Sequence, residues 1–442
     1  MYNLIEKIAE EIKNDLEKGI KICKTKNLEK YEVFESCVIN TSLGIEKNSI
    51  KNYENTFSRG FTCRVLVNGK YALMSSSNLE ECIDNSIKYA TYNELLNDYD
   101  FINERNRVTF LIQKQKLFEE KEMEEIARNL IIKEKNYTTT IGEVSNSIVI
   151  FGVANSSGIF KISNKMSVSA FAAINYKNSS SSFGIVGKNK RTFYEQLKEF
   201  EYAKSVAKKF STTRKISENG RKRKVIFRRE ALAELIEFLI PSIIGINLAT
   251  NSTNLKLFEK NFSEEINLYN LTQHTLLPKT LMDGEGIISK EKELIRKGTL
   301  ENIILNSENL HKIKKNNKEK IDEYEKLLPG NCNRIDFSQK IGESFNIPFL
   351  KPGKGFDYEH EDLIIEEIQG MHTSNPLSGN FSVSVEHGYL INKFSEEIPL
   401  KKFNLSANIF DILKNCYLAK EVKIIAGTTI APEIKTEAII TA

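Results

Sequence analysis

Apolar residues at the start of the chain recur at helical spacing. Leu4, Ile5, Ile8, Ile12 and Leu16 fall on one face, which predicts an amphipathic helix over residues 4–18. Helical patterns also run over residues 78–92, about 118–135 and 195–210. The first half of the chain is therefore predicted to contain four helices.

Between these helices apolar and polar residues alternate, which predicts β-strands. The alternating runs cover residues 31–39, 41–45, 61–67, 71–74, 138–150 and 157–174. Asn68-Gly69 joins two of these runs and is the best short hairpin signal in the chain. The polar tract 178–182 predicts a loop. A few helices set against antiparallel strands indicate an α+β fold.

The pattern changes after residue 214. A polar, charged break over residues 214–224 leads into a predicted strand at 225–227 and a helix at about 229–244. The remainder is strand-rich, apart from a charged helix near 308–328 and a short one near 405–415. Because 442 residues exceed what one compact core accommodates, two domains are expected. We predict an N-terminal domain over 1–215, with helices packed on an antiparallel sheet, and a strand-rich C-terminal domain over 216–442.

Composition limits the classes of partner. The chain has 63 basic and 59 acidic residues, a net charge of +4, so no strong attraction to nucleic acid or membrane is expected. The basic run 221–224 is interpreted as a solvated linker or charged strand edge, with a phosphate-binding patch as the alternative. No apolar run approaches the roughly 18 residues of a membrane helix, and residues 1–16 lack a signal-peptide core. Six scattered cysteines without a C-x-x-C pair favour reduced thiols in a cytoplasm.

Residues with catalytic potential are few. None of the five histidines lies three or four positions from another, so no helix face presents two imidazoles to a metal. His360-Glu361-Asp362 is interpreted as a surface turn rather than a ligand set. Asp283-Gly284-Glu285-Gly286 is interpreted as a tight turn rather than an acid–base pair. We assign no catalytic residue and no metal ligand.

The loop over residues 370–382 is the most distinctive segment. It combines hydroxyl, amide and imidazole groups with two glycines and a proline, and an alternating strand pattern follows directly. Shaped loops on rigid scaffolds often carry binding function. The alternative is a turn that only closes the sheet. Our candidate peptide or partner contacts are His372, Thr373, Ser374, Asn375, Ser378 and Asn380.

Several short motifs occur in a fixed order along nearly the whole chain. They are Arg59-Gly60-Phe61-Thr62-Cys63-Arg64-Val65, Asn155-Ser156-Ser157-Gly158, Asp283-Gly284-Glu285-Gly286, Lys297-Gly298-Thr299-Leu300, Gly379-Asn380-Phe381-Ser382, Gly388-Tyr389-Leu390-Ile391 and Asn408-Ile409-Phe410-Asp411-Ile412-Leu413. The ordered set resembles the TldD/PmbA family. Its members are associated with a cytoplasmic metalloprotease system and, in older descriptions, with modulation of DNA gyrase.

The catalytic kind of family member carries His-Glu-x-x-x-His on the helix that opens the second domain. Here Glu237, Phe238 and Ser242 occupy those three positions. A carboxylate, a phenyl ring and a hydroxyl do not form that metal site. The chain therefore resembles the PmbA-like kind, which implies no cofactor in this chain and zinc in a TldD-like catalytic partner.

The resemblance implies a heterodimer that handles extended peptides or unfolded proteins, with a homodimer as a further possibility. Strand addition, which relies on main-chain hydrogen bonds, is the implied mode of peptide binding. The loop 370–382 is then expected to border a chamber or the partner. One alternative is a divergent metallopeptidase with ligands among His360, His372 and Glu386. A nucleic-acid-associated module based on residues 221–224 is a weaker alternative.

Overall fold

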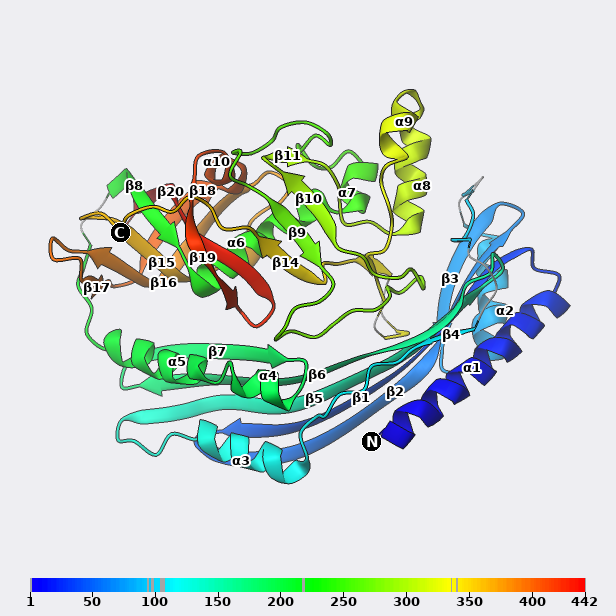
Figure 1. Cartoon of the computed structure of the whole chain (residues 1–442), viewed down its shortest axis with the longest axis horizontal. Coiled ribbons are helices and arrows are strands. Elements are labelled where there is room, and N and C mark those ends of the chain that lie inside the picture. The colour runs from blue at the N-terminus through cyan, green and yellow to red at the C-terminus, as the bar shows by residue number, and fades with distance from the viewer. Residues whose placement is uncertain are drawn as a thin grey trace.

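The computed structural model describes residues 2–93, 95–96, 99–103, 108–216, 219–334, 336–338 and 341–441. Figure 1 shows a long curved sheet with its helices, and above it a strand-rich C-terminal part. The combination of helices packed on an antiparallel sheet with a strand-rich second half confirms the predicted α+β class. No helix among the described residues is long and apolar enough to span a membrane. The division at residue 215 into two domains stays a prediction.

The N-terminal sheet has seven strands in the order β3-β2-β1-β5-β6-β4, with β7 paired to β6. The predicted hairpin at Asn68-Gly69 is present, because β2 and β3 meet there in antiparallel register. The runs 31–39 and 41–45 form one strand, since β1 is paired along its length with β2 on one side and β5 on the other. The bounds are β1 Lys30–Glu46, β2 Ser49–Val67, β3 Lys70–Ser76, β4 Thr109–Leu111, β5 Tyr137–Asn155, β6 Phe160–Tyr176 and β7 Ser179–Gly187.

Helices cover one face of this sheet. The apolar stripe of the first helix is fully buried, with Ile12 and Leu16 at 0% exposure. They share a core with strand residues such as Val33 on β1 and Cys63 on β2. Because side chains alternate between the two faces of a strand, these residues point to the face that the helices cover. The prediction of a loop at residues 178–182 is wrong. A tight turn at Lys177, with φ +53°, leads directly into β7. The helices are α1 Tyr2–Thr25, α2 Leu79–Ala90, α3 Glu120–Leu130, α4 Lys190–Tyr194 and α5 Lys198–Lys209.

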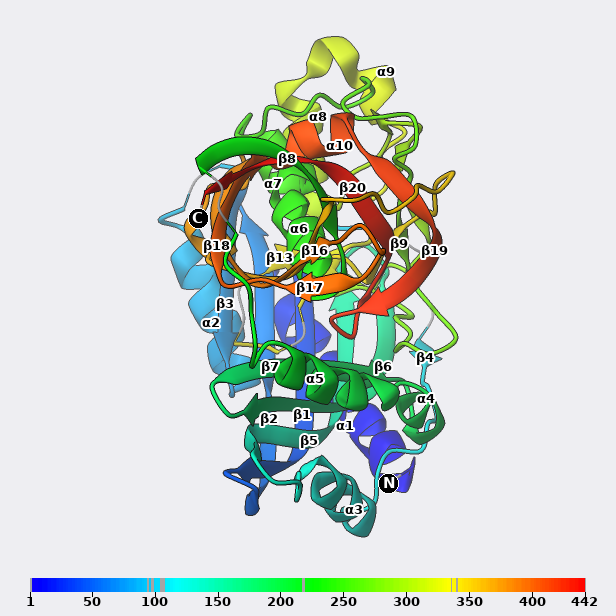
Figure 2. The ribbon, with the colours of Figure 1, turned by 90° about the vertical axis from the view of Figure 1, so that its left-hand side faces the viewer.

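The C-terminal part is built around a closed ring of strands. The order β20-β18-β16-β15-β8 closes because β20 also pairs with β8. Figure 2 looks into this ring and shows α6 inside it. The ring strands and the helix are β8 Asn219–Phe227, α6 Arg229–Leu239, β15 Leu363–Gln369, β16 Asn380–Ile391, β18 Phe403–Asn408 and β20 Thr429–Thr441.

Further strands extend the ring into an eleven-stranded sheet. The single charged helix predicted near 308–328 is interrupted after Asn316, and the short helix predicted near 405–415 begins only at Ile409. These remaining elements are η1 Ile240–Ile243, α7 Gly245–Ala249, β9 Leu268–Leu271, β10 Lys292–Arg296, β11 Thr299–Leu300, α8 Ser307–Asn316, η2 Lys318–Lys320, α9 Ile321–Tyr324, β12 Cys332–Asn333, β13 Gly342–Glu343, β14 Ile347–Leu350, η3 Met371–Thr373, β17 Glu397–Pro399, α10 Ile409–Lys414 and β19 Tyr417–Ile425.

Buried ion pairs join the N-terminal sheet to the C-terminal part. Arg64 on β2 binds Glu32 on β1 and reaches Glu285, with Nη1 2.9 Å from Glu285 Oε1. Arg334 also binds Glu32, at 2.7 Å. All four side chains are 3% exposed or less. Burial alone would raise the pKa of Glu32, but the charges of Arg64 and Arg334 hold it below its usual value.

Glu285 lies in the turn predicted at residues 283–286. Asp283 Oδ1 accepts hydrogen bonds from the N–H groups of Glu285 and Ile287, both at 2.9 Å, which is how an aspartate shapes a tight turn. Glu285 in turn accepts a hydrogen bond from the N–H of Ser307 at 2.9 Å. Both carboxylates therefore have structural partners, and the turn is present as predicted.

Candidate functional site

The helix α6 carries both the apolar filling of the ring and a stripe of carboxylates. It follows β8 directly: Arg228 is extended, and Arg229 turns the chain with φ +51°. Leu235 and Leu239 face the core at 4% exposure or less. Glu230, Glu234 and Glu237 are four and three residues apart and therefore share the other face.

The predicted helix 229–244 is too long. The α-helix ends at Leu239 and continues as the 3₁₀ turn η1. Pro241 lacks an N–H and its ring clashes with a helical carbonyl four residues back, so an α-helix cannot run through it undisturbed. Glu237 and Ser242 consequently lie on different elements.

The three positions aligned with the metal motif have other roles. Phe238 is 6% exposed and packs edge-on against Phe381, with ring centroids 5.7 Å apart. Ser242 is fully buried and donates a hydrogen bond to the Pro376 carbonyl at 3.0 Å. Glu237 is exposed. One residue therefore fills the core, one fastens the loop 370–382, and one faces solvent.

A groove of about 510 Å³ lies between this end of α6 and the loop. Its apolar floor includes Phe238, Ile368 and Met371, each 6% exposed or less. Glu234 and Glu237 form one rim. The full lining is Glu234, Glu237, Phe238, Pro241, Ile368, Gln369, Gly370, Met371, His372, Ser374 and Pro376.

The groove also borders an edge of β15. That strand pairs in parallel with β8 only from Leu363 to Ile365, and the N–H of Arg228 donates the last bond, to the Ile365 carbonyl at 3.0 Å. Ile368 and Gln369 pair with β16 on the opposite side. Within the described residues, no strand pairs with their other edge, because the chain has left β8 to form α6.

The loop contributes two kinds of residue. His372 and Ser374 line the groove, with His372 exposed. The other four candidate contacts make hydrogen bonds that brace the loop or attach it to the neighbouring strand. Thr373 Oγ1 donates to the Gly370 carbonyl, Asn375 Oδ1 accepts from the Leu377 N–H, Ser378 Oγ donates to the Asn375 carbonyl, and Asn380 Oδ1 accepts from Asn408 Nδ2. Their role as peptide or partner contacts stays a prediction.

Burial and like charge shape the electrostatics around α6. Burial raises the pKa of Glu234 to about 7, and the carboxylates of Glu237 and Glu367 add to the rise. The pKa of Glu230 is likewise raised to about 7, mainly by burial. His387 Nδ1 lies 2.6 Å from Glu367 Oε2. Burial opposes protonation of His387, but the hydrogen bond and charge of Glu367 raise its pKa overall.

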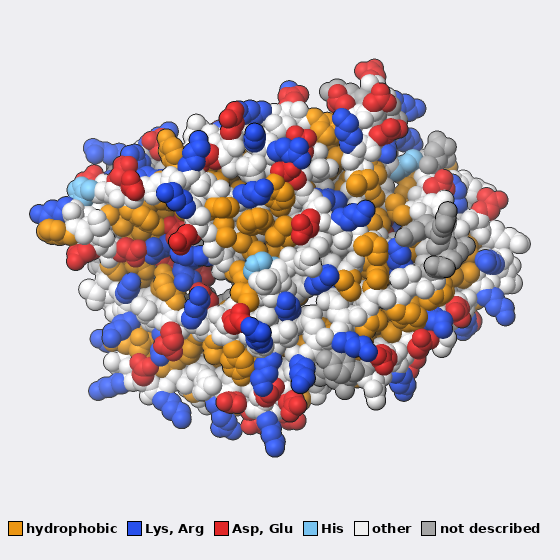
Figure 3. All heavy atoms as spheres, in the orientation of Figure 1, with side chains coloured by type: hydrophobic (Ala, Val, Ile, Leu, Met, Phe, Trp, Pro, Cys, Tyr) orange, Lys and Arg blue, Asp and Glu red, His pale blue; other side chains and the backbone are white. Residues whose placement is uncertain are grey.

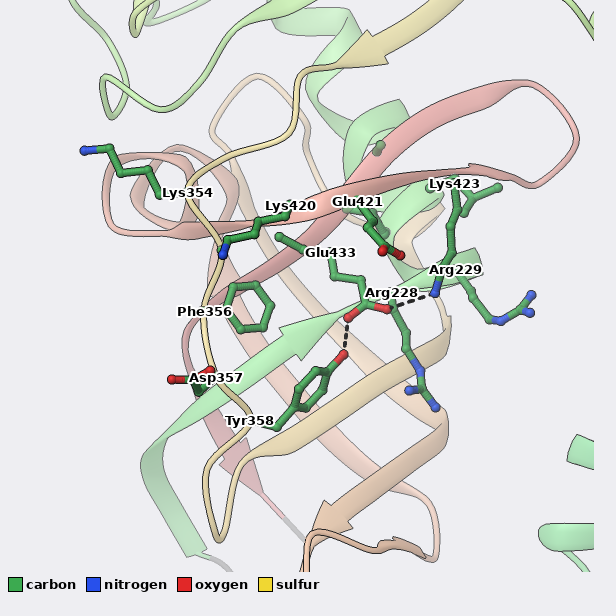
Figure 4. Close-up of a pocket in the computed structure, with 15 residues that line it drawn as sticks. Arg228, Arg229, Lys354, Phe356, Asp357, Tyr358, Lys420, Glu421, Lys423 and Glu433 are labelled. Atoms are coloured by element: carbon green, nitrogen blue, oxygen red, sulfur yellow. Dashed lines mark hydrogen bonds and ion pairs between the residues drawn. The ribbon is translucent and has the colours of Figure 1, made fainter.

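A separate pocket of about 580 Å³ lies at the start of α6 (Figure 4). The figure shows Tyr358 and Lys423 both directed at Glu433. Arg228 binds Glu366 and Glu397, and Arg229 pairs with Glu199 on α5. Arg228 therefore fixes the start of α6 to strands β15 and β17, and Arg229 attaches it to the N-terminal helix α5.

The arrangement offers little support for the alternative ligand set. His360 and His372 are exposed, whereas Glu386 pairs with Lys402. Within the described residues, no group of three or more His, Cys, Asp or Glu side chains is placed to hold a metal. The basic run also has structural partners: Lys222 pairs with Glu437 and Lys224 with Glu359, both at 2.7 Å. Acidic and basic side chains are interspersed over the face shown in Figure 3.

Sequence reasoning missed the groove, one of its two carboxylates and two further carboxylates close to it. Glu230, Glu234 and Glu367 were not singled out, although glutamates at helical spacing on an otherwise apolar helix were a usable signal. Glu367 could not be associated with them from sequence, because it lies more than 130 positions away.

The sequence of the chain is similar to that of known proteins. Residues 220–442 match the family described as PmbA/TldA metallopeptidase C-terminal domain, and residues 31–90 match PmbA/TldA metallopeptidase domain 1. An uncharacterized protein from Methanocaldococcus jannaschii is 26% identical over 432 residues, which cover 95% of this chain and 98% of that protein.

Two solved structures share the fold. TldE from Thermococcus kodakarensis has a TM-score of 0.79 at 21% identity and covers 98% of this chain and 100% of its own. A protein described as a proposed modulator of a DNA gyrase, from Thermotoga maritima, has a TM-score of 0.78 at 20% identity, with coverage of 97% and 99%. At these identities the likeness shows the fold alone.

Proposed function

Because the chain belongs to the PmbA/TldD metallopeptidase family, we propose that it is a PmbA-like supporting subunit of a two-component peptidase. In this proposal the chain holds no metal of its own. A TldD-like partner supplies zinc and the catalytic groups, and the substrates are extended peptides or unfolded proteins. In such a pair, one subunit binds the substrate and the other cleaves it.

The observation that carries the proposal is the use made of the motif positions. Phe238 and Ser242 are buried, Phe238 in packing against Phe381 and Ser242 in a hydrogen bond to the loop, while Glu237 is the one exposed side chain of the three. Metal-assisted peptide hydrolysis needs ligands for the ion and a base for the water. A lone carboxylate beside a phenyl ring and a hydroxyl provides neither a ligand set nor a metal-bound water.

The groove beside β15 supports a role in holding substrate. An extended segment placed along the outer edge of Ile368 and Gln369 would continue the sheet and gain main-chain hydrogen bonds that do not depend on sequence. The apolar floor would accept every second side chain of such a segment, because side chains alternate along a strand. A subunit of this kind presents peptides and leaves the cleavage to its partner.

The first test is the metal content of the chain purified alone. After gentle desalting we expect no stoichiometric zinc or iron, and no peptidase activity on an unfolded protein. About one tightly held metal per chain, or full activity of the isolated chain, would overturn the proposal.

The second test adds a TldD-like subunit that contains His-Glu-x-x-x-His. We expect the two proteins to co-elute in size-exclusion chromatography, and cleavage of an unfolded protein to require both. A catalytic subunit that neither binds this chain nor gains activity from it would contradict the assignment.

A further inference from the structure

We propose that the groove between α6 and the outer edge of β15 selects extended peptide segments that carry lysine or arginine. The inference rests on the proposed function, since it names the class of peptide that the supporting subunit would hold. It concerns the same groove of about 510 Å³ and adds a charge preference to it.

The main-chain part of the site is the strand edge. The pairing between β8 and β15 ends at Ile365, whose carbonyl accepts a hydrogen bond from the N–H of Arg228. Beyond this point Ile368 pairs with Val385 and Gln369 with Ser384, on the inner side only. In the described part of the chain, the outer side of these two residues has no strand neighbour. An edge of this kind is a template for one more strand.

The floor of the groove fits the alternate side chains of an added strand. Phe238, Ile368 and Met371 are buried apolar residues, and Pro241 and Pro376 flank them. The hydrogen bond from Ser242 to the Pro376 carbonyl fixes the loop at this end of the groove. Every second residue of a bound segment would therefore face an apolar surface, and the residues between would face the rim.

The rim is negatively charged and lacks counter-ions. Among the described residues that line the groove, Glu234 and Glu237 are acidic, His372 is the one imidazole, and none is lysine or arginine. In the same part of the chain neither glutamate has a salt-bridge partner, whereas Glu366 and Glu386 on the neighbouring strands β15 and β16 pair with Arg228 and Lys402. Cationic side chains on a bound segment would complete these pairs, and their charge would be favoured over neutral or acidic side chains.

The ionisation of Glu234 gives the preference a pH dependence. Burial, together with the neighbouring charges of Glu237 and Glu367, raises the pKa of Glu234 to about 7. The groove therefore gains negative charge as the pH rises through neutrality. A lysine-rich segment should bind more tightly at pH 8 than at pH 5.5 and release protons on binding, because its cations favour the ionised carboxylate.

The test uses three fluorescein-labelled ten-residue peptides in which valine alternates with lysine, glutamine or glutamate. Binding to the full chain is measured by fluorescence anisotropy at pH 5.5 and pH 8. At pH 8 we expect the lysine peptide to bind about tenfold more tightly than the glutamine peptide, since a partly buried pair with Glu234 and an exposed pair with Glu237 each contribute about a threefold gain. The glutamate peptide should bind most weakly, and the advantage of lysine should fall several-fold at pH 5.5.

Variants locate the preference. Glu234→Gln combined with Glu237→Gln should lower the affinity for the lysine peptide to that for the glutamine peptide. The matched control, Glu323→Gln with Glu325→Gln, makes the same change in charge outside the groove, on and just after α9, and should keep the advantage. Glu237→Gln alone should lower the advantage of the lysine peptide partly. Because Glu237 is exposed, this variant should fold normally and keeps the test valid if the double variant does not fold.

Equal affinity for the three peptides, or a lysine advantage that survives in the double groove variant, would overturn the inference. Either result leaves the supporting-subunit proposal standing, because that depends on metal content and on association with the catalytic partner. Conversely, a catalytic subunit that does not bind this chain would contradict the proposed function, whereas the measured preference of the groove for lysine peptides would be unchanged.

Discussion

Replacing Arg64 by methionine should destabilise the protein strongly. Arg64 is 1% exposed and makes three charged hydrogen bonds: two to Glu32, at 2.6 and 2.8 Å, and one to Glu285, at 2.9 Å. Methionine fills a similar volume but removes the positive charge. Arg334 is then the guanidinium left beside the two buried carboxylates, and its ion pair is with Glu32. Among the described residues, Glu285 then keeps its hydrogen bonds from the N–H and hydroxyl of Ser307 and has no cation beside it in an ion pair.

The expected loss is about 3–5 kcal/mol of unfolding free energy, the range for breaking a buried pair by removing one partner. Urea unfolding at pH 7, followed by circular dichroism, measures it as a lower midpoint. Because the pKa of Glu32 lies below its usual 4.5 in the fold, its contribution is present above pH 4.5 and is lost as the pH falls. The difference between wild type and Arg64→Met should therefore shrink at acid pH.

A surface control separates charge from substitution effects. Arg128→Met removes an exposed arginine whose Nη2 lies 3.5 Å from Glu124, and should leave the midpoint almost unchanged. Adding Glu285→Gln to Arg64→Met should recover part of the loss, since one uncompensated charge disappears. If Arg64→Met loses less than about 1 kcal/mol, or loses the same at acid and neutral pH, the electrostatic reasoning is wrong.

Three further predictions concern single positions. Gly298→Ala should cost more than about 2 kcal/mol in urea unfolding, because φ is +80° and a Cβ would lie 2.2 Å from the Phe262 carbonyl oxygen, whereas Gly184→Ala, with open space at its Cβ, should be nearly neutral. Leu235→Ala should cost roughly 2–5 kcal/mol by leaving a cavity inside the ring, and a loss below about 1 kcal/mol would mean that α6 is not packed as described. The thermal midpoint should fall from pH 5 to pH 7.5, because the pKa of Glu230 is about 7 in the folded state and 4.5 in the unfolded state, so the folded state binds more protons in that window. Glu230→Gln should make this fall smaller, and an unchanged dependence of the midpoint on pH would count against the pKa assignment.

The sequence by itself determined most elements of the first half. The helical stripe from Leu4 to Leu16 and the Asn68-Gly69 hairpin depend on local periodicity and turn chemistry, and both are present. Local signals failed where neighbours decide the outcome. Residues 31–39 and 41–45 merge because strands on both sides continue the ladder. Residues 179–182 become strand because β6 offers an edge and because Ser181, Phe183 and Ile185 face the core.

The family resemblance and the substitutions at Glu237, Phe238 and Ser242 were also legible in the sequence. What those side chains do was not: only the packed structure places Phe238 against Phe381 and Ser242 against the loop. The groove likewise needed tertiary structure, because its two sides come from residues 234–241 and 368–376. The chain leaves β8 to form α6 while β15 runs on, and that divergence opens a strand edge beside a row of carboxylates. Periodicity reports which face of an element is buried, whereas a site between elements depends on which of them pair and where the pairing stops.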